Sequence, residues 1–215
     1  KGGDVLTYER TFTLPSDFNK GVVLLNFGAC DQETTVYING EKVGENYGGY
    51  LPFTFDITEN LKDGENTVKV VVLDDADSDI YGRGKQTYKR GGIWYTATSG
   101  IWQTVFLESV PKNYIRSIKL TPNYDEKTLK VSGDTVGAGE IKVEVMDGDV
   151  VISTAVGVNE VTLDVSMCKE WNLNSPELYK VFVSYCDDRV ESYFGLRKFS
   201  IIVSSSLVKL SKIFK

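Results

Sequence analysis

The residues best suited to chemistry lie in one stretch, residues 74–99, that shows no regular hydrophobic period. The stretch opens with a dense acidic cluster, Asp74-Asp75-Ala76-Asp77-Ser78-Asp79. Carboxylate oxygens at alternating positions could bind a hard cation such as Ca²⁺. The EF-hand pattern fails, because counting from Asp75 puts Ile80 where glycine is required and Gln86 where the bidentate glutamate belongs. We therefore interpret the cluster as a solvated loop, keep Asp75 as a candidate contact to a cation or polar sugar, and predict no metal site.

A basic and amide-bearing segment, Arg83-Gly84-Lys85-Gln86, follows in the same stretch. Guanidinium, ammonium and amide groups donate hydrogen bonds that suit sugar hydroxyls or the carboxylate of an acidic sugar. A mobile basic turn without a ligand is the alternative. Arg83, Lys85 and Gln86 are therefore candidate sugar contacts.

Two aromatic residues, Trp94 and Tyr95, complete the candidate set. Trp94 follows Gly91-Gly92 and precedes Thr96-Ala97-Thr98, in a run with neither the period of a strand nor that of a helix. Such a loop can offer aromatic faces to a sugar or to another domain. Core packing is the competing interpretation, and we expect Trp94 to be an exposed platform.

The composition excludes several classes of function. The chain has no histidine, which removes the commonest general base, metal ligand and partner of a nucleophile. Three widely spaced cysteines without a CxxC pair (Cys30, Cys168, Cys186) predict free buried thiols rather than disulfides or a zinc site. A net charge of -6 argues against nucleic acid, and no apolar run of about 18 residues suggests a membrane partner. No cofactor is predicted.

The elements that must position these residues are β-strands. Short runs of β-forming residues separated by turn residues predict strands at 8–14, 22–27, 34–38, 54–57, 66–73 and 101–108. Asn39-Gly40 predicts a tight hairpin, and Asp63-Gly64 predicts a second turn. Residues 1-111 are therefore expected to form one antiparallel β-sandwich domain.

The predicted strand at 101–108 is apolar on both faces. One face carries Ile101, Val105 and Leu107, and the other carries Trp102, Thr104 and Phe106. A strand buried on both sides explains this pattern, and so does a face built to meet another domain. Trp102 and Phe106 are candidates for such an interface, through which the chain could also self-associate.

A second domain is expected after Pro111, over residues 112-203. Strands are predicted at 115–120, 128–132, 141–146, 150–156, 160–165, 179–185 and 190–195, a spacing typical of an immunoglobulin-like sandwich. Residues 204-215 look like a short amphipathic tail without an assigned function. The predicted fold class is all-β: two antiparallel β-sandwich domains, the first a jelly roll and the second immunoglobulin-like.

Several segments taken in order resemble one family of enzymes. The segments are Tyr8-Glu9-Arg10-Thr11-Phe12, Asn26-Phe27-Gly28-Ala29-Cys30-Asp31, Val36-Tyr37-Ile38-Asn39-Gly40, Gly48-Gly49-Tyr50-Leu51-Pro52-Phe53 and Gly92-Ile93-Trp94-Tyr95-Thr96-Ala97-Thr98-Ser99-Gly100-Ile101-Trp102. They resemble the galactose-binding-like jelly-roll domain of glycoside hydrolase family 2, which contains β-galactosidases and β-glucuronidases. Residues 112-203 resemble the immunoglobulin-like module of that family through Trp171, Pro176, Leu178, Tyr179 and Phe194-Gly195-Leu196-Arg197.

The resemblance implies a division of labour between domains. In this family a TIM barrel that follows the immunoglobulin-like module carries both catalytic glutamates, and this chain ends about where that barrel would start. The resemblance therefore implies a non-catalytic N-terminal portion of a β-glycosidase, with carbohydrate and the barrel as partners and with Arg197 at the barrel interface. No catalytic residue is assigned, and the chain alone is expected to be inactive. The loop that holds Arg83 would reach toward the barrel's active site.

The resemblance leaves the sugar open. Trp94 stands about where the galactosidase and glucuronidase branches have an acidic residue that touches the sugar, so neither specificity carries over. A free-standing carbohydrate-binding pair of β-sandwiches is the alternative function. A structural or adhesion module without a ligand is a third. The protein is expected to be soluble and bacterial, either cytoplasmic or secreted.

Overall fold

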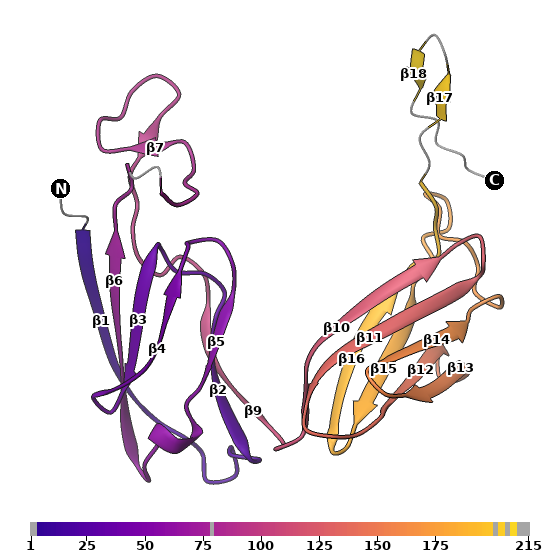
Figure 1. The fold of residues 1–215 in the computed structure, drawn as a ribbon, viewed down its shortest axis with the longest axis horizontal. Helices are drawn as coiled ribbons and strands as arrows, with labels where there is room; N and C mark the ends of the chain where they lie inside the picture. The colour runs from indigo at the N-terminus through magenta and orange to yellow at the C-terminus, as the bar shows by residue number, and fades with distance from the viewer. Residues whose placement is uncertain (1–3, 78–79, 200–201, 205–206, 210–215) are drawn as a thin grey trace. The chain divides into compact units, whose positions relative to one another are not determined.

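The computed structural model describes residues 4–77, 80–199, 202–204 and 207–209. In these residues the regular structure is β-strand, apart from one short 3-10 turn, η1 (Thr58–Asn60). The chain divides into two units, Lys1–Val110 and Pro111–Lys215 (Figure 1). The predicted all-β fold class is confirmed.

The first unit is a sandwich of two antiparallel sheets (Figure 1). One sheet has the order β1 (Asp4–Thr13), β6 (Glu65–Asp74), β3 (Glu33–Ile38) and β4 (Glu41–Tyr47). The other has the order β5 (Phe53–Asp56), β2 (Val22–Phe27) and β9 (Val105–Val110). Alternate side chains of β2, β3 and β6 meet between the sheets and form one buried cluster: Val23, Leu25, Phe27, Val36, Ile38, Val70 and Val72.

The turns that the sequence predicted are present. Asn39 and Gly40 have φ of 51° and 87°, and they join β3 to β4 as the left-handed pair that matches the twist of the strands. The Asn39 side chain also donates to the carbonyl of Asn60 at 2.8 Å, which ties the hairpin to η1. Gly64, with φ of 80°, forms the turn before β6. Both turn predictions are confirmed.

The prediction for residues 101–108 is wrong about where the strand begins. The strand begins only at Val105, because Gly100 has φ of +106° and Ile101 forms just an isolated bridge with Cys30. Of the two explanations for the apolar faces, burial on both sides does not hold, since Phe106 is 49% exposed and Trp102, which precedes the strand, is 50% exposed. β9 is an edge strand that pairs only with β2 among the described strands.

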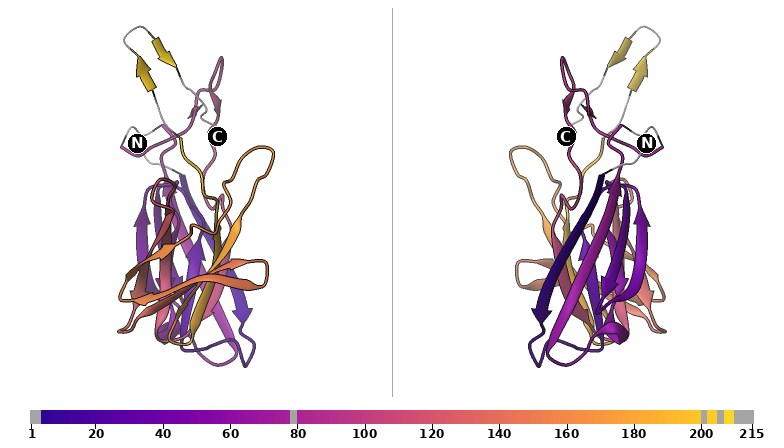
Figure 2. Two further views of the ribbon diagram at one scale, coloured as in Figure 1. Left: turned by 90° about the vertical axis from the view of Figure 1, so that its right-hand side faces the viewer. Right: turned by 90° about the vertical axis from the view of Figure 1, so that its left-hand side faces the viewer.

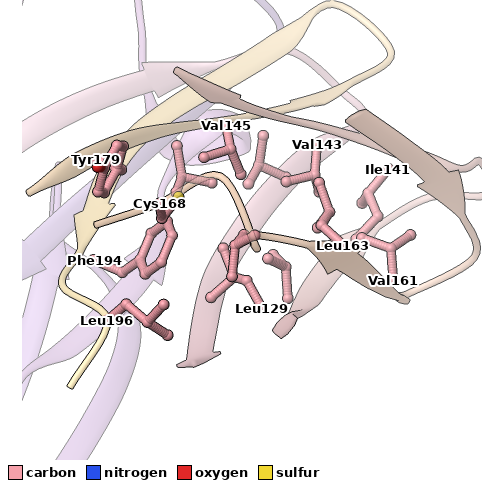
Figure 3. Packing of buried hydrophobic residues seen from close by; sticks show 14 of the residues in the cluster. Leu129, Ile141, Val143, Val145, Val161, Leu163, Cys168, Tyr179, Phe194 and Leu196 are labelled. Atoms are coloured by element: carbon pink, nitrogen blue, oxygen red, sulfur yellow. The ribbon is translucent and has the colours of Figure 1, made fainter. Parts of the chain in front are cut away.

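The second unit packs a sheet of three strands on a sheet of four. The first sheet has the order β10 (Tyr114–Asn123), β11 (Thr128–Val136) and β14 (Glu160–Asp164). The second has the order β13 (Val150–Gly157), β12 (Ile141–Asp147), β15 (Tyr179–Tyr185) and β16 (Asp188–Phe194). Figure 3 shows Leu129, Val143, Leu163 and Phe194 pointing toward one another between these sheets. The seven predicted strands are present, and three on four is the arrangement of an immunoglobulin-like sandwich.

Two predictions concern the cysteines and the tail. Cys30 and Cys168 are buried free thiols, but Cys186 is exposed, because it lies at φ of 50° in the turn between β15 and β16. The predicted burial is therefore wrong for Cys186. β17 (Ile202–Ser204), which begins at the end of the predicted second domain, pairs with β18 (Leu207–Lys209) in the tail, while residues 205–206 and 210–215 lie outside the described residues. No described helix has the length and apolarity needed to cross a membrane.

The contact between Gly100 and Tyr8 gives a test of the first unit. A Cβ added at Gly100 would lie 2.1 Å from Tyr8 Oη, which accepts a hydrogen bond from the Ile101 amide. Gly100→Ala should therefore lower the free energy of unfolding by roughly 3 kcal/mol, through backbone strain plus overpacking. Gly48→Ala is the matched control, since Gly48 has φ of +99° with nothing within 4 Å of the added Cβ. It should cost only about 1–2 kcal/mol.

Urea unfolding of the two variants measures the difference. Equal losses would show that the contact with Tyr8 contributes nothing beyond the backbone conformation.

Candidate functional site

The candidate residues lie on the loop that joins β6 in one sheet to β9 in the other. The loop extends beyond the ends of β1 and β6 in Figure 1, and the same projection is visible in both views of Figure 2. It contains a short parallel pair, β7 (Gln86–Thr87) with β8 (Tyr95–Thr96). Ser78 and Asp79 of the acidic cluster lie outside the described residues.

Arg83 joins the beginning of this loop to its middle. Its Nη1 donates to Asp77 Oδ1 at 3.1 Å, to the carbonyl of Ala76 at 3.2 Å and to the carbonyl of Gln86 at 3.2 Å. Asp77 also accepts a hydrogen bond from the Tyr88 amide at 3.3 Å. The Arg83 side chain is only 23% exposed, so this charge-assisted network is partly shielded from water. It joins the end of β6 to β7.

Three other predicted contacts also contribute to the loop framework. The Gln86 side-chain oxygen accepts from the Thr98 amide at 2.9 Å, and the Lys85 carbonyl accepts from the Tyr95 amide at 2.7 Å. Asp75 is fixed through its backbone, because its carbonyl accepts from Gln32 Nε2 at 3.3 Å. The acceptor of the Gln86 amide is thus already occupied within the protein.

A cavity of about 390 Å³ lies in this loop. It is lined by Asp77, Arg83, Thr87, Lys89 and Trp94. The volume falls in the range of small-molecule sites, about 300–1,000 Å³. Trp94 is 45% exposed, which rules out the core-packing interpretation and leaves ring surface available to a ligand.

The structure brings together only part of the predicted set. Arg83 and Trp94 line the cavity, and the residues that do not line it are Asp75, Lys85, Gln86 and Tyr95. Sequence reasoning missed Thr87 and Lys89 as lining residues, and it noted Asp77 only as a member of the acidic cluster. Their closeness in sequence to Arg83 or Gln86 could have indicated all three as lining residues, since each lies within a few residues of one of them.

The cavity carries both signs of charge. Asp77 and Arg83 form an ion pair, while Lys89 forms none among the described residues. The lining therefore combines a carboxylate acceptor, cationic donors, a hydroxyl and one aromatic face. Such a mixture suits a polyhydroxylated ligand, whose hydroxyls pair with the polar groups while its C–H face covers the indole.

A second group of aromatic residues supports the neighbouring part of the loop. The Trp102 indole donates to the carbonyl of Gly49 at 2.8 Å, and its ring meets Tyr50 edge to face at 5.8 Å. Trp102 and Phe106, two of the three interface candidates, both belong to the first unit and are half exposed. Arg197, the third interface candidate, belongs to the second unit, where its guanidinium contacts Trp171.

Asp31 is an acidic residue with an unusual environment beside this group. Burial, and secondarily the negative charge of Asp74, raises the pKa of Asp31 to about 6. A backbone hydrogen bond from Gly100 opposes the increase in the pKa. Asp31 therefore changes its charge in a pH range where an ordinary aspartate is already ionised.

The raised pKa of Asp31 predicts a pH dependence of stability. The folded protein keeps this proton up to about pH 6, whereas the unfolded chain loses it near pH 4, so stability should fall as pH rises between these values. The loss should be about 1–2 kcal/mol after allowance for partial exposure. Asp31→Asn should therefore be more stable than the natural protein at pH 7 and equal to it at pH 4.

Urea unfolding of both proteins at several pH values between 4 and 7 tests this dependence. A variant that is less stable at pH 7 would mean that the ionised carboxylate is stabilising.

Comparison with known proteins gives the family. The family model described as "Glycosyl hydrolases family 2, sugar binding domain" matches residues 3–111. A putative β-glucuronidase of Formosa agariphila is 26% identical over 211 residues, which cover 89% of this chain and 25% of that protein. A β-galactosidase of Thermoanaerobacter pseudethanolicus is 29% identical over 193 residues, covering 82% of this chain and 25% of that protein.

A solved structure has the same fold. The β-glucuronidase of Ruminococcus gnavus in complex with D-glucaro-d-lactam superimposes with a TM-score of 0.75 at 22% identity, covering 94% of this chain and 37% of that one. The chain thus spans about a quarter of the length of the two relatives. The predicted family resemblance is confirmed, and the matched residues include the whole loop that forms the cavity. The chain belongs to glycosyl hydrolase family 2, and its first unit is matched by the sugar binding domain of that family.

Proposed function

We propose that this chain is the non-catalytic, sugar-binding portion of a family 2 β-glycosidase. Its first unit provides a site beside Trp94 that helps to hold the sugar, and both sandwiches support a catalytic barrel in the longer protein. The observation that carries the proposal is the cavity lined by Trp94, Arg83 and Asp77, because it lies inside the region that the sugar binding domain matches.

The lining explains why a sugar is the proposed ligand. The exposed face of Trp94 can cover the apolar C–H face of a pyranose ring, as aromatic rings do at partly wet binding sites. Lys89 and Thr87 supply a donor and a hydroxyl toward the ring substituents, while Arg83 and Asp77 hold the wall in place. Names of the relatives, β-galactosidase and β-glucuronidase, agree with a β-linked sugar.

The same lining explains why hydrolysis is assigned to another domain. Cleavage of a glycosidic bond needs two carboxyl groups that flank it, about 5–5.5 Å apart for retention or about 6.5–9.5 Å apart for inversion. The described lining of the cavity offers one carboxylate, Asp77, which is engaged by Arg83 and the Tyr88 amide. Both catalytic carboxyl groups, one of them the general acid, would come from the barrel.

The scaffolding role would use exposed apolar surface. Trp102 and Phe106 are 50% and 49% exposed, and they lie on or next to edge strand β9. Aromatic side chains of this kind are enriched at the centres of protein interfaces. In the longer protein they would meet the barrel, and in the 215-residue chain they would favour self-association at high concentration.

Trp94→Ala tests the sugar site. The change should weaken binding of simple β-glycosides about five- to tenfold, because the stacking face is worth about 1 kcal/mol or slightly more. It should lower the free energy of unfolding by less than about 1 kcal/mol, since the ring is half exposed. Ile93→Ala is the control, because Ile93 is 67% exposed and does not line the cavity.

Calorimetric titration with methyl β-galactoside and methyl β-glucuronide, together with urea unfolding, gives both quantities. Equal affinity of the natural protein and Trp94→Ala would remove Trp94 from the site.

The proposal that another domain carries out the hydrolysis can be tested separately. The 215-residue chain should cleave none of a panel of nitrophenyl β-glycosides, whereas the full-length gene product should cleave at least one of them, because only the latter would hold the carboxylate pair. Turnover that copurifies with the 215-residue species would contradict the proposal. Sugar binding without an active longer form would instead favour a free-standing carbohydrate-binding module.

A further inference from the structure

Arg197, just after β16 in the second unit, is held between two aromatic rings. Its guanidinium carbon lies 4.4 Å from the centre of the Trp171 ring and 3.7 Å from the centre of the Phe199 ring. Stacking on ring faces is favourable for a guanidinium and leaves the N–H groups at its edge free to donate in its own plane. Arg197 therefore has fewer orientations to lose on binding than an ordinary exposed arginine.

The Trp171 ring is itself fixed to the sandwich. The Trp171 amide donates to the carbonyl of Leu196 at 3.0 Å, and Glu170 forms a parallel bridge with Leu196. A Cβ added at Gly195 would lie 3.2 Å from Trp171 Cδ1, so the ring lies directly against the backbone that leads to Arg197. The aromatic support is thus part of the folded unit.

The neighbouring carboxylates already have partners. Glu170 accepts a hydrogen bond from the Tyr124 hydroxyl and lies 3.6 Å from Lys127 Nζ. Asp125 forms an ion pair with Lys198, the residue next to Arg197. Arg197 itself forms no ion pair with any carboxylate in the described part of the chain. Its charge is therefore available to a carboxylate from outside.

The surface around Arg197 has the composition of an interface. Phe199, which contacts Arg197, is 72% exposed, and Leu178, which lies beside Trp171 on Gly195, is 55% exposed. An arginine surrounded by large apolar side chains is a common centre of binding energy in protein interfaces. Exposed apolar side chains around an arginine add binding energy only when a partner covers them, so this composition favours an interface over a free surface.

We propose that Arg197 binds the carboxylate of an aspartate or glutamate on the catalytic domain of the longer protein, through a two-pronged hydrogen-bonded ion pair. This inference rests on the proposed function, which places that domain after the second unit. The planar fork of a guanidinium matches the two oxygens of a carboxylate. Among the side chains of a folded domain, carboxylates are the ones with that geometry and charge.

The test compares Arg197→Gln with Arg189→Gln in the full-length gene product. Arg189 is the matched control, because it is also exposed in the second unit and stacks on one ring, that of Phe182, at 4.0 Å. Both variants should lower the urea midpoint of the 215-residue chain only slightly, because each loses exposed cation–π contacts. In the full-length protein, Arg197→Gln should speed proteolytic cleavage within residues 200–206 at least tenfold, since losing one partner of a buried charge-assisted pair weakens an interface by that factor or more.

Arg197→Lys should give a cleavage rate between those of the natural protein and Arg197→Gln, because lysine keeps the positive charge but lacks the planar, two-pronged guanidinium. Equal cleavage rates for Arg197→Gln and Arg189→Gln in an active enzyme would overturn the inference while leaving the proposed function intact. An inactive full-length protein that still shows the difference would overturn the proposed function and, with it, the assignment of the carboxylate to a catalytic domain. A 215-residue chain that dimerises only with Arg197 present would assign the carboxylate to a second copy and so overturn the inference.

Discussion

The burial of alternate side chains between two sheets fixes both ends of the loop that forms the cavity. Phe27 illustrates the constraint: it is 1% exposed, stacks on Phe53 at 4.7 Å and meets Phe55 edge to face at 6.5 Å. Because β6 belongs to one sheet and β9 to the other, the loop between Asp74 and Val105 must cross from layer to layer. Its ends are therefore held as rigidly as the core, even where the loop itself is open to solvent.

Among the described residues from Asp75 to Ser99, Ala76 is the only buried apolar residue, so this part of the loop depends on polar contacts. Arg83 joins residues 76–77, just after β6, to Gln86 in β7, and the Gln86 side chain ties β7 to Thr98. Hydrogen bonds to charged groups are stronger than neutral ones, especially when partly buried. This explains why a loop made largely of glycine and polar residues can still hold Trp94 beside a defined cavity. The loop is thus suited to the binding role that we propose.

Local patterns were sufficient to predict the fold. The Asn39-Gly40 hairpin follows from residue types alone, and the strands of the second unit follow from alternation, because both signals lie within a few residues. The start of β9 was mispredicted because alternation continues through residues 101–104, whereas the backbone there is set by a distant contact of Tyr8 with Gly100 and Ile101. The exposure of Cys186 was also missed. Cys186 lies in a turn with a left-handed backbone conformation, but the turn carries no Asn-Gly pair that would have predicted it from the sequence.

The site could be predicted only in part. Arg83 and Trp94 were found because their side-chain chemistry is distinctive, but Lys89 and Thr87 reach the cavity only through the pairing of β7 with β8 and the Asp77–Arg83 contact. The proposed function requires that a sugar binds beside Trp94. The chain has three tryptophans, each in a different environment, so their indole N–H signals in a nitrogen-15 NMR spectrum report separately on the cavity, on Trp102 and on Trp171. Titration with a β-glycoside should shift the Trp94 signal and leave that of Trp171 in place; an unchanged Trp94 signal at saturation would contradict the account.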